Sequence, residues 1–217
     1  MVSAKVNQSN QLLQHFPHIV LASTSPRRAD LLRQIGFEFQ IQPSQVAEPE
    51  IEHTSPTIAV QNLALAKAKA VAAELKKGLV IGADTVVVVN QQVVGKPDSD
   101  QDAIGILTRL SGNHHEVITG VALVDIDRGR EVVWAETTVV YFRKLRQSEI
   151  EEYVRSGEAS DKAGAYGIQG RGAAFVERVE GCYFNVVGLP LASLVEKLWG
   201  LIDYTNCQST IALPDSE

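Results

Sequence analysis

The sequence predicts an α/β fold in which helices flank a mixed, twisted sheet. Short apolar runs typical of buried strands, such as residues 18–22 and 79–90, alternate with segments of helical periodicity. No internal repeat and no shift in composition marks a linker. We therefore expect one domain over residues 17–202, wound into two lobes around a central cleft, with flexible tails at 1–16 and 203–217.

The first half of the chain is predicted to supply two strands and two helices. Ser25 is a suitable N-cap and Pro26 a favoured first helical residue, so a helix is expected to begin there and to end at Gly36. The next helical pattern is the longest in the chain and has no internal Gly or Pro. The predicted elements are a strand at 18–22, a helix at 26–35, a strand at 37–42 and a helix at 54–77.

The second half is predicted to be rich in β-structure. Ser99 and Asp102 resemble a capping box that opens a helix, and turn-forming residues at 125–130 separate two β-rich runs, which indicates a hairpin. A second hairpin is expected around Gly181. The predicted elements are a strand at 79–90, a helix at 99–110, a hairpin at 116–145, a helix at 147–156, a hairpin at 173–187 and a helix at 190–199.

One acid interrupts the predicted strand at 79–90. Asp84 lies in the stretch Gly82-Ala83-Asp84-Thr85, with apolar runs on both sides. An ionised carboxylate leaves water only when a cation, a metal or several hydrogen bonds compensate it. An acid within a core strand therefore indicates a functional site and not packing.

Two cations are predicted to point inward, as Asp84 does. Arg28 lies on the apolar stripe of its helix, and Lys67 lies on the apolar stripe of the helix predicted at 54–77. Because both side chains face the core from separate helices, we expect them to converge on Asp84.

Five motifs occur in order along the chain, and together they resemble the Maf family of nucleoside triphosphate pyrophosphatases. The resemblance runs from about residue 18 to residue 201. The motifs are Ser23-x-Ser25-Pro26-Arg27-Arg28, Leu63-Ala64-x-x-Lys67-Ala68, Gly82-Ala83-Asp84-Thr85, Lys96-Pro97 and Gly164-Ala165-Tyr166-Gly167-Ile168-Gln169-Gly170.

The resemblance implies a Maf/ITPase-like fold and a nucleotide as substrate. It implies hydrolysis between the α- and β-phosphates, giving a nucleoside monophosphate and pyrophosphate, with a divalent metal cation, Mg²⁺ or Mn²⁺, as cofactor. The form of the glycine-rich motif implies the branch that prefers dTTP and UTP, with modified pyrimidine nucleotides as further substrates. The alternative within the family is the branch that acts on 7-methyl-GTP.

The resemblance also implies roles for individual residues. Asp84 matches the family's proton acceptor, and positions that select the base match Arg27, Thr85 and Gln169. Glu48 matches a position that assists the metal together with Asp84. The preceding residue, Ala47, departs from members that carry two acids there.

The residues themselves suit phosphate chemistry. A helix N-terminus with free N–H groups, flanked by Arg27 and Arg28, is an expected binding site for a triphosphate. Lys67 and Lys96 would add point charges, and Ser23 completes the predicted substrate-binding set. Hydrolysis needs an activated water and stabilisation of the leaving pyrophosphate. Asp84 suits the first need either as general base or as ligand of a metal that lowers the pKa of water, and the sequence leaves both open.

Composition narrows the class of protein. Twenty Lys and Arg against 26 Asp and Glu give a formal net charge of −6, which argues against nucleic acid as a partner. Two cysteines without close spacing support neither a disulfide framework nor a thiolate metal site. With no signal peptide and no spanning segment, the sequence predicts a cytoplasmic protein without a membrane partner. A homodimer is expected only because homodimers are the commonest assembly of soluble proteins.

Two other classes of function compete with the enzyme. The Maf family is also associated with arrest of cell division, so a nucleotide-sensing binding module is one alternative. Asp125 and Asp127 follow an apolar run and resemble the nucleophile motif of a monoester phosphatase. The following Arg128-Gly129 favours a hairpin turn there instead.

Overall fold

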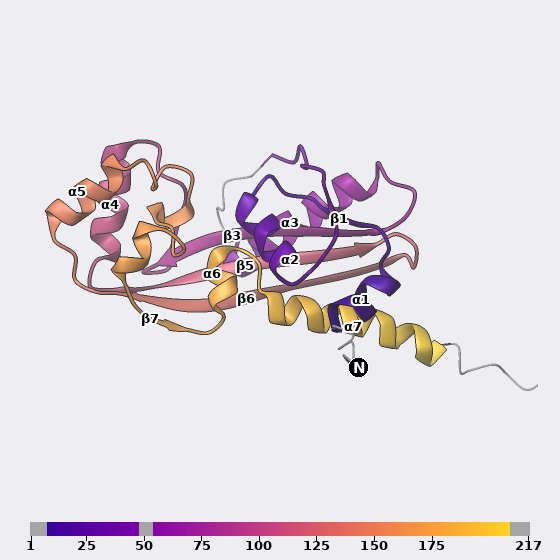
Figure 1. Ribbon diagram of the computed structural model, residues 1–217. Helices are drawn as coiled ribbons and strands as arrows, with labels where there is room; N and C mark the ends of the chain where they lie inside the picture. The colour runs from indigo at the N-terminus through magenta and orange to yellow at the C-terminus, as the bar shows by residue number, and fades with distance from the viewer. Residues whose placement is uncertain (1–7, 48–53, 209–217) are drawn as a thin grey trace, which may run out of the picture.

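The computed structural model describes residues 8–47 and 54–208 and shows a long, twisted sheet covered by helices (Figure 1). It confirms the predicted α/β fold. The strands of the described part are β1 (Ile19–Leu21), β2 (Gln40–Ile41), β3 (Leu79–Val89), β4 (Gln92–Val94), β5 (His114–Asp125), β6 (Arg130–Phe142) and β7 (Val176–Glu180). The helices are α1 (Gln8–His15), α2 (Pro26–Gln34), α3 (Pro56–Ala72), α4 (Asp100–Leu110), α5 (Gln147–Arg155), α6 (Tyr183–Val187) and α7 (Leu191–Gln208), with 3₁₀ segments η1 (Ala163–Ala165) and η2 (Arg171–Phe175).

The sheet is mixed, with strand order β2-β1-β3-β5-β6-β7. β1 runs parallel to β2 and β3, and the helices α2 and α3 provide the crossovers that parallel neighbours require. β3, β5, β6 and β7 pair antiparallel, and β4 folds back on the end of β3. The long hairpin of β5 and β6 confirms the one predicted at 116–145.

Successive strand residues point to opposite faces of the sheet, which therefore carries two apolar layers. On one face, Val80 and Ala122 pack against Ala64 of α3. On the other face, Ile81 and Val121 belong to a larger core that includes residues of α1, α2, α4, α5 and α7. The near-continuous apolar runs of β3 and β5 follow from burial on both sides.

Glycines let α3 lie directly on the sheet. A Cβ atom on Gly82 would be 2.2 Å from the carbonyl oxygen of Ala64, and one on Gly120 would be 2.3 Å from that of Val60. Gly120 is the register partner of Asp84 on β5, and Gly82 precedes Asp84 by two residues, so all three share the face that α3 covers. This close approach brings the α3 side chains onto the Asp84 position.

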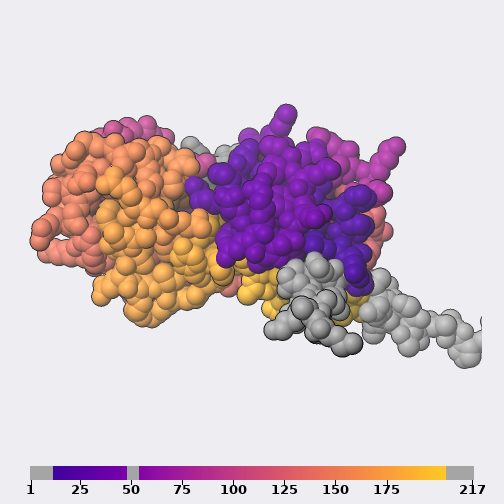
Figure 2. All heavy atoms as spheres, viewed as in Figure 1, coloured from indigo at the N-terminus to yellow at the C-terminus, as the bar shows by residue number. Residues whose placement is uncertain are grey.

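The helices gather at two ends of the long strands. α4 and α5 lie at one end, and α1, α2 and α7 lie at the other (Figure 1). The violet N-terminal segments and the orange C-terminal segments meet along a hollow in the surface (Figure 2). No helix in the described ranges has the length and apolar character needed to cross a membrane.

Both ends of the domain hold more structure than predicted. α1 lies in the segment expected to be a tail, with Leu12 and Phe16 buried. Arg128 of the β5–β6 turn lies 5.2 Å from the centre of the Phe16 ring and donates a hydrogen bond to the carbonyl oxygen of His15. At the other end, α7 continues to Gln208, beyond the helix expected at 190–199. A few apolar residues in a polar segment are enough to dock it on the core.

The hairpin predicted at 173–187 is wrong in its second half. β7 pairs with β6, but the chain then turns into the short helix α6. The buried side chain of Asn185 explains this turn, since its amide donates to the Val117 carbonyl at 2.9 Å and to Thr138 Oγ1 at 3.0 Å. A helix of five residues is too short for apolar periodicity to reveal. Two further elements are shorter than predicted, because β2 keeps only Gln40–Ile41 and α3 ends at Ala72.

We predict that Gly120→Ala lowers the free energy of unfolding by about 3 kcal/mol, because the added methyl group meets backbone that cannot move aside. Urea unfolding followed by circular dichroism measures this loss. Gly105→Ala in α4 is the matched control, because no atom lies within 4 Å of its added Cβ. The control is expected to raise stability by about 0.5–1 kcal/mol, and equal behaviour of the two variants would contradict the packing account.

Candidate active site

A gap in the strand ladder opens the site. β1 pairs with residues 79–81 of β3, and β4 pairs with residues 87–89. Between them, residues 82–86 have β5 on one side and no strand of the described chain on the other. The adjacent side chains of Asp84 and Thr85 reach opposite sides of the sheet at this unpaired edge and line one cleft.

Asp84 forms a buried ion pair with Lys67 of α3. The distance from Lys67 Nζ to Asp84 Oδ1 is 2.8 Å, and each residue is 8% exposed. The predicted inward phase of Lys67 is confirmed, since it is buried with Val60, Ala64 and Val71 on α3. No described residue donates a hydrogen bond to Asp84 Oδ2. Lys67 thus compensates the carboxylate, and Asp84 keeps one oxygen for the cleft.

Arg28 joins three segments on the other side of the gap. Its Nε donates to the Gly188 carbonyl at 2.9 Å, one terminal nitrogen donates to Ser23 Oγ at 3.1 Å, and the other donates to Thr85 Oγ1 at 3.0 Å. Thr119 donates its own proton to a backbone carbonyl in α6, so Thr85 must donate to Thr119, 2.9 Å away. Arg28 therefore orients the hydroxyls of Ser23 and Thr85 that face the cleft.

Arg27 lies at the N-terminus of α2 and faces the second lobe. Its guanidinium is 3.3 Å from a carboxylate oxygen of Asp161, and the other oxygen of Asp161 is 2.6 Å from Lys162 Nζ. Ser25 occupies the N-cap position as predicted, but its hydroxyl makes no capping hydrogen bond. The helix N-terminus, Arg27 and Lys162 thus form a cationic rim on which Asp161 is the counter-charge.

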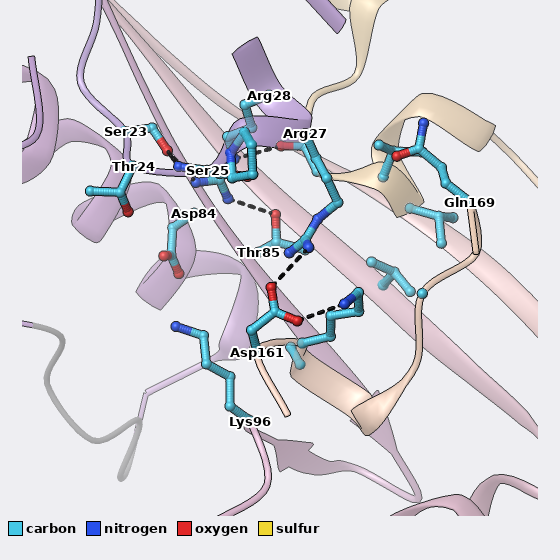
Figure 3. Close-up of a pocket in the computed structure, with 18 of the residues that line it drawn as sticks. Ser23, Thr24, Ser25, Arg27, Arg28, Asp84, Thr85, Lys96, Asp161 and Gln169 are labelled. Atoms are coloured by element: carbon cyan, nitrogen blue, oxygen red, sulfur yellow. Dashed lines mark hydrogen bonds and ion pairs between the residues drawn. The ribbon is translucent and has the colours of Figure 1, made fainter. Parts of the chain in front are cut away.

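Gln169 and Lys96 complete the cleft from two other segments. Gln169 is exposed on the glycine-rich loop opposite α2, and Lys96 extends into the cleft from the segment after β4 (Figure 3). The cleft has a volume of about 640 Å³. Its charged lining consists of Arg27, Arg28, Lys67, Lys96, Lys162, Asp84, Glu158 and Asp161. An excess of cations in a hollow of this size suits a small polyanion.

The predicted site residues of the described chain share this one cleft. The residues brought together are Ser23, Arg27, Arg28, Lys67, Asp84, Thr85, Lys96 and Gln169. Glu48, predicted to assist a metal, lies outside the described residues. Asp125 and Asp127 lie at the β5–β6 turn instead, where Asp125 pairs with Arg128 at 2.8 Å and Asp127 accepts from the Gly78 amide. These two acids hold the turn, as the hairpin interpretation predicted.

A divalent cation is compatible with the donors present. In the described ranges, no group of three or more His, Cys, Asp or Glu side chains could hold a metal ion. Mg²⁺, however, usually takes one or two carboxylates and completes its shell with water and substrate phosphate oxygens. Asp84 Oδ2 offers one such carboxylate oxygen inside the cleft. The donor set therefore fits a cation that arrives with a nucleotide better than a preformed metal cage.

Three charged residues of the cleft were missed by the sequence reasoning. Glu158, Asp161 and Lys162 come directly before the glycine-dense run and line the cleft with it. Asp161 and Lys162 stand next to each other in the sequence, a pattern that also occurs on solvated surfaces. Their position shortly before the glycine-rich motif is the one signal in the sequence that could have identified them.

The fold and the site define an α/β protein with a cation-rich cleft built around one paired, buried carboxylate. The chain matches the family model described as Maf-like protein over residues 18–201, and it belongs to the Maf family. The resemblance noted from the five motifs is therefore confirmed.

Relatives of known name cover most of the chain. A dTTP/UTP pyrophosphatase of Moorella thermoacetica is 55% identical over 180 residues, which cover 83% of this chain and 93% of that protein. A dTTP/UTP pyrophosphatase of Syntrophomonas wolfei is 50% identical over 172 residues, covering 79% and 91%. Among solved structures, the Ham1 protein of Staphylococcus aureus is 18% identical with a TM-score of 0.42, covering 58% of this chain and 71% of that one.

We predict that Lys67→Met destabilises the fold by up to about 3–5 kcal/mol, because it leaves the Asp84 carboxylate buried without its cation. Chemical unfolding at pH 7 measures this change. Lys69→Met is the matched control on the same helix, because the Lys69–Glu131 pair is exposed and is expected to contribute under about 1 kcal/mol. Equal losses in both variants would show that Lys67 does not stabilise Asp84.

A buried histidine below the cleft should make stability depend on pH. His115 Nε2 is 2.8 Å from the hydroxyl of Tyr166, a cleft residue, and burial lowers the pKa of His115 to about 4, with a smaller contribution from His114. The unfolded chain, with a histidine pKa near 6.5, binds this proton more readily. We therefore predict that stability falls by up to about 3 kcal/mol as pH drops from about 6.5 to 4.

Carboxylates also take up protons toward the acid end of this range. The effect of His115 is therefore isolated by comparing the loss of stability of the natural protein with that of His115→Phe. The replacement keeps an aromatic ring beside Phe142 and Tyr166, whose ring centres lie 5.1 and 5.3 Å from that of His115. Urea unfolding at pH 7 and pH 5 should show a smaller loss of stability in the variant. Parallel losses in both proteins would mean that His115 is not the cause.

Proposed function

We propose that this chain hydrolyses dTTP and UTP, and modified pyrimidine nucleoside triphosphates, between the α- and β-phosphates. The products are the nucleoside monophosphate and pyrophosphate. The names of the relatives support this substrate class. The observation that carries the proposal is the Asp84–Lys67 pair inside a cleft with a cationic rim. The proposal is supported because this carboxylate shares the cleft with several cationic side chains, which suit phosphate.

Asp84 takes the proton of the attacking water in this proposal. Lys67 holds Oδ1, so Oδ2 accepts the proton as the water oxygen bonds to phosphorus and pyrophosphate leaves. Arg27 and Lys96 stabilise the charge that develops on the leaving group. Arg27 must release Asp161 to do so, and that exchange is feasible because both side chains are partly exposed.

A divalent cation completes the proposed site. When bound, Mg²⁺ or Mn²⁺ lowers the pKa of coordinated water and neutralises phosphate charge. Asp84 would hold it together with the phosphate oxygens, and Glu48, outside the described residues, is the second proposed ligand. The general-base and metal-ligand roles of Asp84 both need Oδ2, so they are alternatives: as a ligand, Asp84 would hold the cation in place of accepting the proton itself.

Gln169 is proposed to recognise the base. Its amide presents one acceptor oxygen and two donor hydrogens, which match the alternating donor and acceptor edge of uracil or thymine. It lies at the mouth of the cleft, across from the phosphate-binding end of α2 (Figure 3). Arg27 and Thr85 line the same cleft and complete the proposed selection of substrate.

We predict that Asp84→Asn lowers kcat for dTTP by about 10²–10⁴-fold, because an amide cannot accept the proton. The dissociation constant for dTTP should change only a few-fold, since the phosphate-binding cations remain. Steady-state assays with Mg²⁺ that identify pyrophosphate as the direct product, together with calorimetric titration, measure both quantities. Asp98→Asn, in an exposed loop outside the cleft, is the control and should behave as the natural protein does.

Three outcomes would contradict the proposal. Turnover unchanged in Asp84→Asn would remove the assigned proton acceptor. Orthophosphate as the first product would indicate a monoester phosphatase instead. Binding of triphosphates by the natural protein without any hydrolysis, across several divalent cations, would indicate a nucleotide-sensing module.

A further inference from the structure

The loop that carries Gln169 is wrapped around one carboxylate. Glu158 Oε2 accepts a hydrogen bond from the Arg171 amide at 3.0 Å, and Oε1 accepts from the Gly172 amide at 3.3 Å. Glu158 Oε1 also accepts from the hydroxyl of Tyr153 at 3.0 Å. Both oxygens are therefore occupied by groups of the protein and serve the loop more than the cleft that Glu158 lines.

Tyr153 extends this support to the start of the loop. Its hydroxyl, which donates to Glu158, accepts from the Gly167 amide at 3.0 Å. Tyr153 is buried on α5, and its ring packs edge-on against Phe175, with ring centres 4.9 Å apart. The carboxylate and the phenol thus hold the loop on both sides of Gln169 and tie it to a rigid helix.

The loop glycines match the space around this carboxylate. A Cβ atom on Gly170 would be 2.3 Å from Glu158 Oε1, and one on Gly167 would be 3.1 Å from the same oxygen. The backbone therefore approaches the carboxylate closely at both positions. This gives the two glycines a structural reason that is separate from contact with a ligand.

Glu158 is held as an anion. Burial would raise its pKa, but the hydrogen bonds from the Arg171 and Gly172 amides and from Tyr153, with the nearby charge of Lys162, lower the pKa below its ordinary value. Hydrogen bonds to an ionised acceptor are about twice as strong as those between neutral groups. The anion is therefore well suited to fix a glycine-rich backbone that would otherwise be free to move.

We propose that Glu158 is a positioning residue for substrate selection: its carboxylate, with the Tyr153 hydroxyl, fixes the backbone at 167–172 and thereby sets where Gln169 meets the base. The inference rests on the proposed function, because it takes Gln169 as the base-recognising group. Glu158 itself does not touch the reacting atoms. It acts through the loop, and its loss is expected to lower substrate selectivity.

Glu158→Gln is the informative substitution because it keeps the size of the side chain. The new amide group places a donor where an oxygen now accepts a backbone N–H, so one loop amide loses its partner. We expect KM for dTTP to rise about tenfold, in line with losses from misplaced groups of up to about 10²-fold, while kcat changes less than threefold. The ratio of kcat/KM for dTTP over CTP should fall by a similar factor.

A double-variant cycle separates positioning from general damage. If Glu158 acts through Gln169, Glu158→Gln should lower the dTTP/CTP ratio little further when added to Gln169→Ala. Glu152→Gln is the matched control, because Glu152 contacts the side chain of Arg171 and not the loop backbone. The control should leave KM and the ratio unchanged.

Amide hydrogen exchange gives a readout that does not depend on turnover. Exchange at residues 167–172 should be faster in Glu158→Gln than in the natural protein. If Glu158→Gln does not fold, Tyr153→Phe provides the test, since it removes one hydroxyl and keeps the ring packing on Phe175. Tyr153→Phe should raise KM for dTTP and speed up loop exchange, as Glu158→Gln is expected to do.

The inference is overturned if a folded Glu158→Gln or Tyr153→Phe variant keeps the natural dTTP/CTP ratio. It is also overturned if the two substitutions of the cycle multiply, if kcat falls equally for all substrates, or if loop exchange is unchanged. A natural protein that hydrolyses neither dTTP nor UTP would instead refute the proposed function. In that case the exchange readout still decides whether Glu158 holds the loop.

Discussion

The approach of α3 to the sheet at Gly82 and Gly120 is the constraint on which the site depends. These two positions carry no Cβ atom, so the helix backbone rests on β3 and β5 at the place where Asp84 lies. Only at that distance does Lys67 meet the carboxylate at 2.8 Å. A buried acid would otherwise carry the full penalty of losing its hydration. Close packing of α3 on the sheet thus lets Lys67 compensate the buried carboxylate of Asp84.

A second network fixes the opposite side of the gap. Arg28 uses its guanidinium to connect Ser23, Thr85 and Gly188, which come from three different segments of the chain. Within the described ranges, its neighbour Arg27 is held by one partly exposed ion pair, with Asp161. The two adjacent arginines therefore have different roles. Arg28 is a fixed part of the cleft wall, whereas Arg27 can exchange its contact with Asp161 for a contact with a ligand.

The sequence could predict the parts of the site that have local signatures. Asp84 is recognisable because an acid interrupts an apolar strand, and Lys67 because a cation follows the stripe of a helix. Two partners of Arg28, Thr85 and Gly188, lie 57 and 160 residues away, and no local pattern specifies such contacts. The same holds for Glu158, whose role comes from amides that only the folded loop presents. Periodicity also missed α6, whose contacts with the sheet include the hydrogen bonds of the buried Asn185 side chain.

The strand that carries Asp84 and Thr85 has a consequence for how the family's chemistry can change. Adjacent residues of β3 serve opposite sides of the sheet, the acid toward Lys67 and the hydroxyl toward Arg28. A slip of β3 by one residue would place either Thr85 or Ala83 opposite Lys67, so the ammonium would lose its carboxylate partner in both directions. Insertions or deletions in this strand should therefore be incompatible with activity. A point substitution on one side of the sheet, in contrast, leaves the side chains on the other side in place.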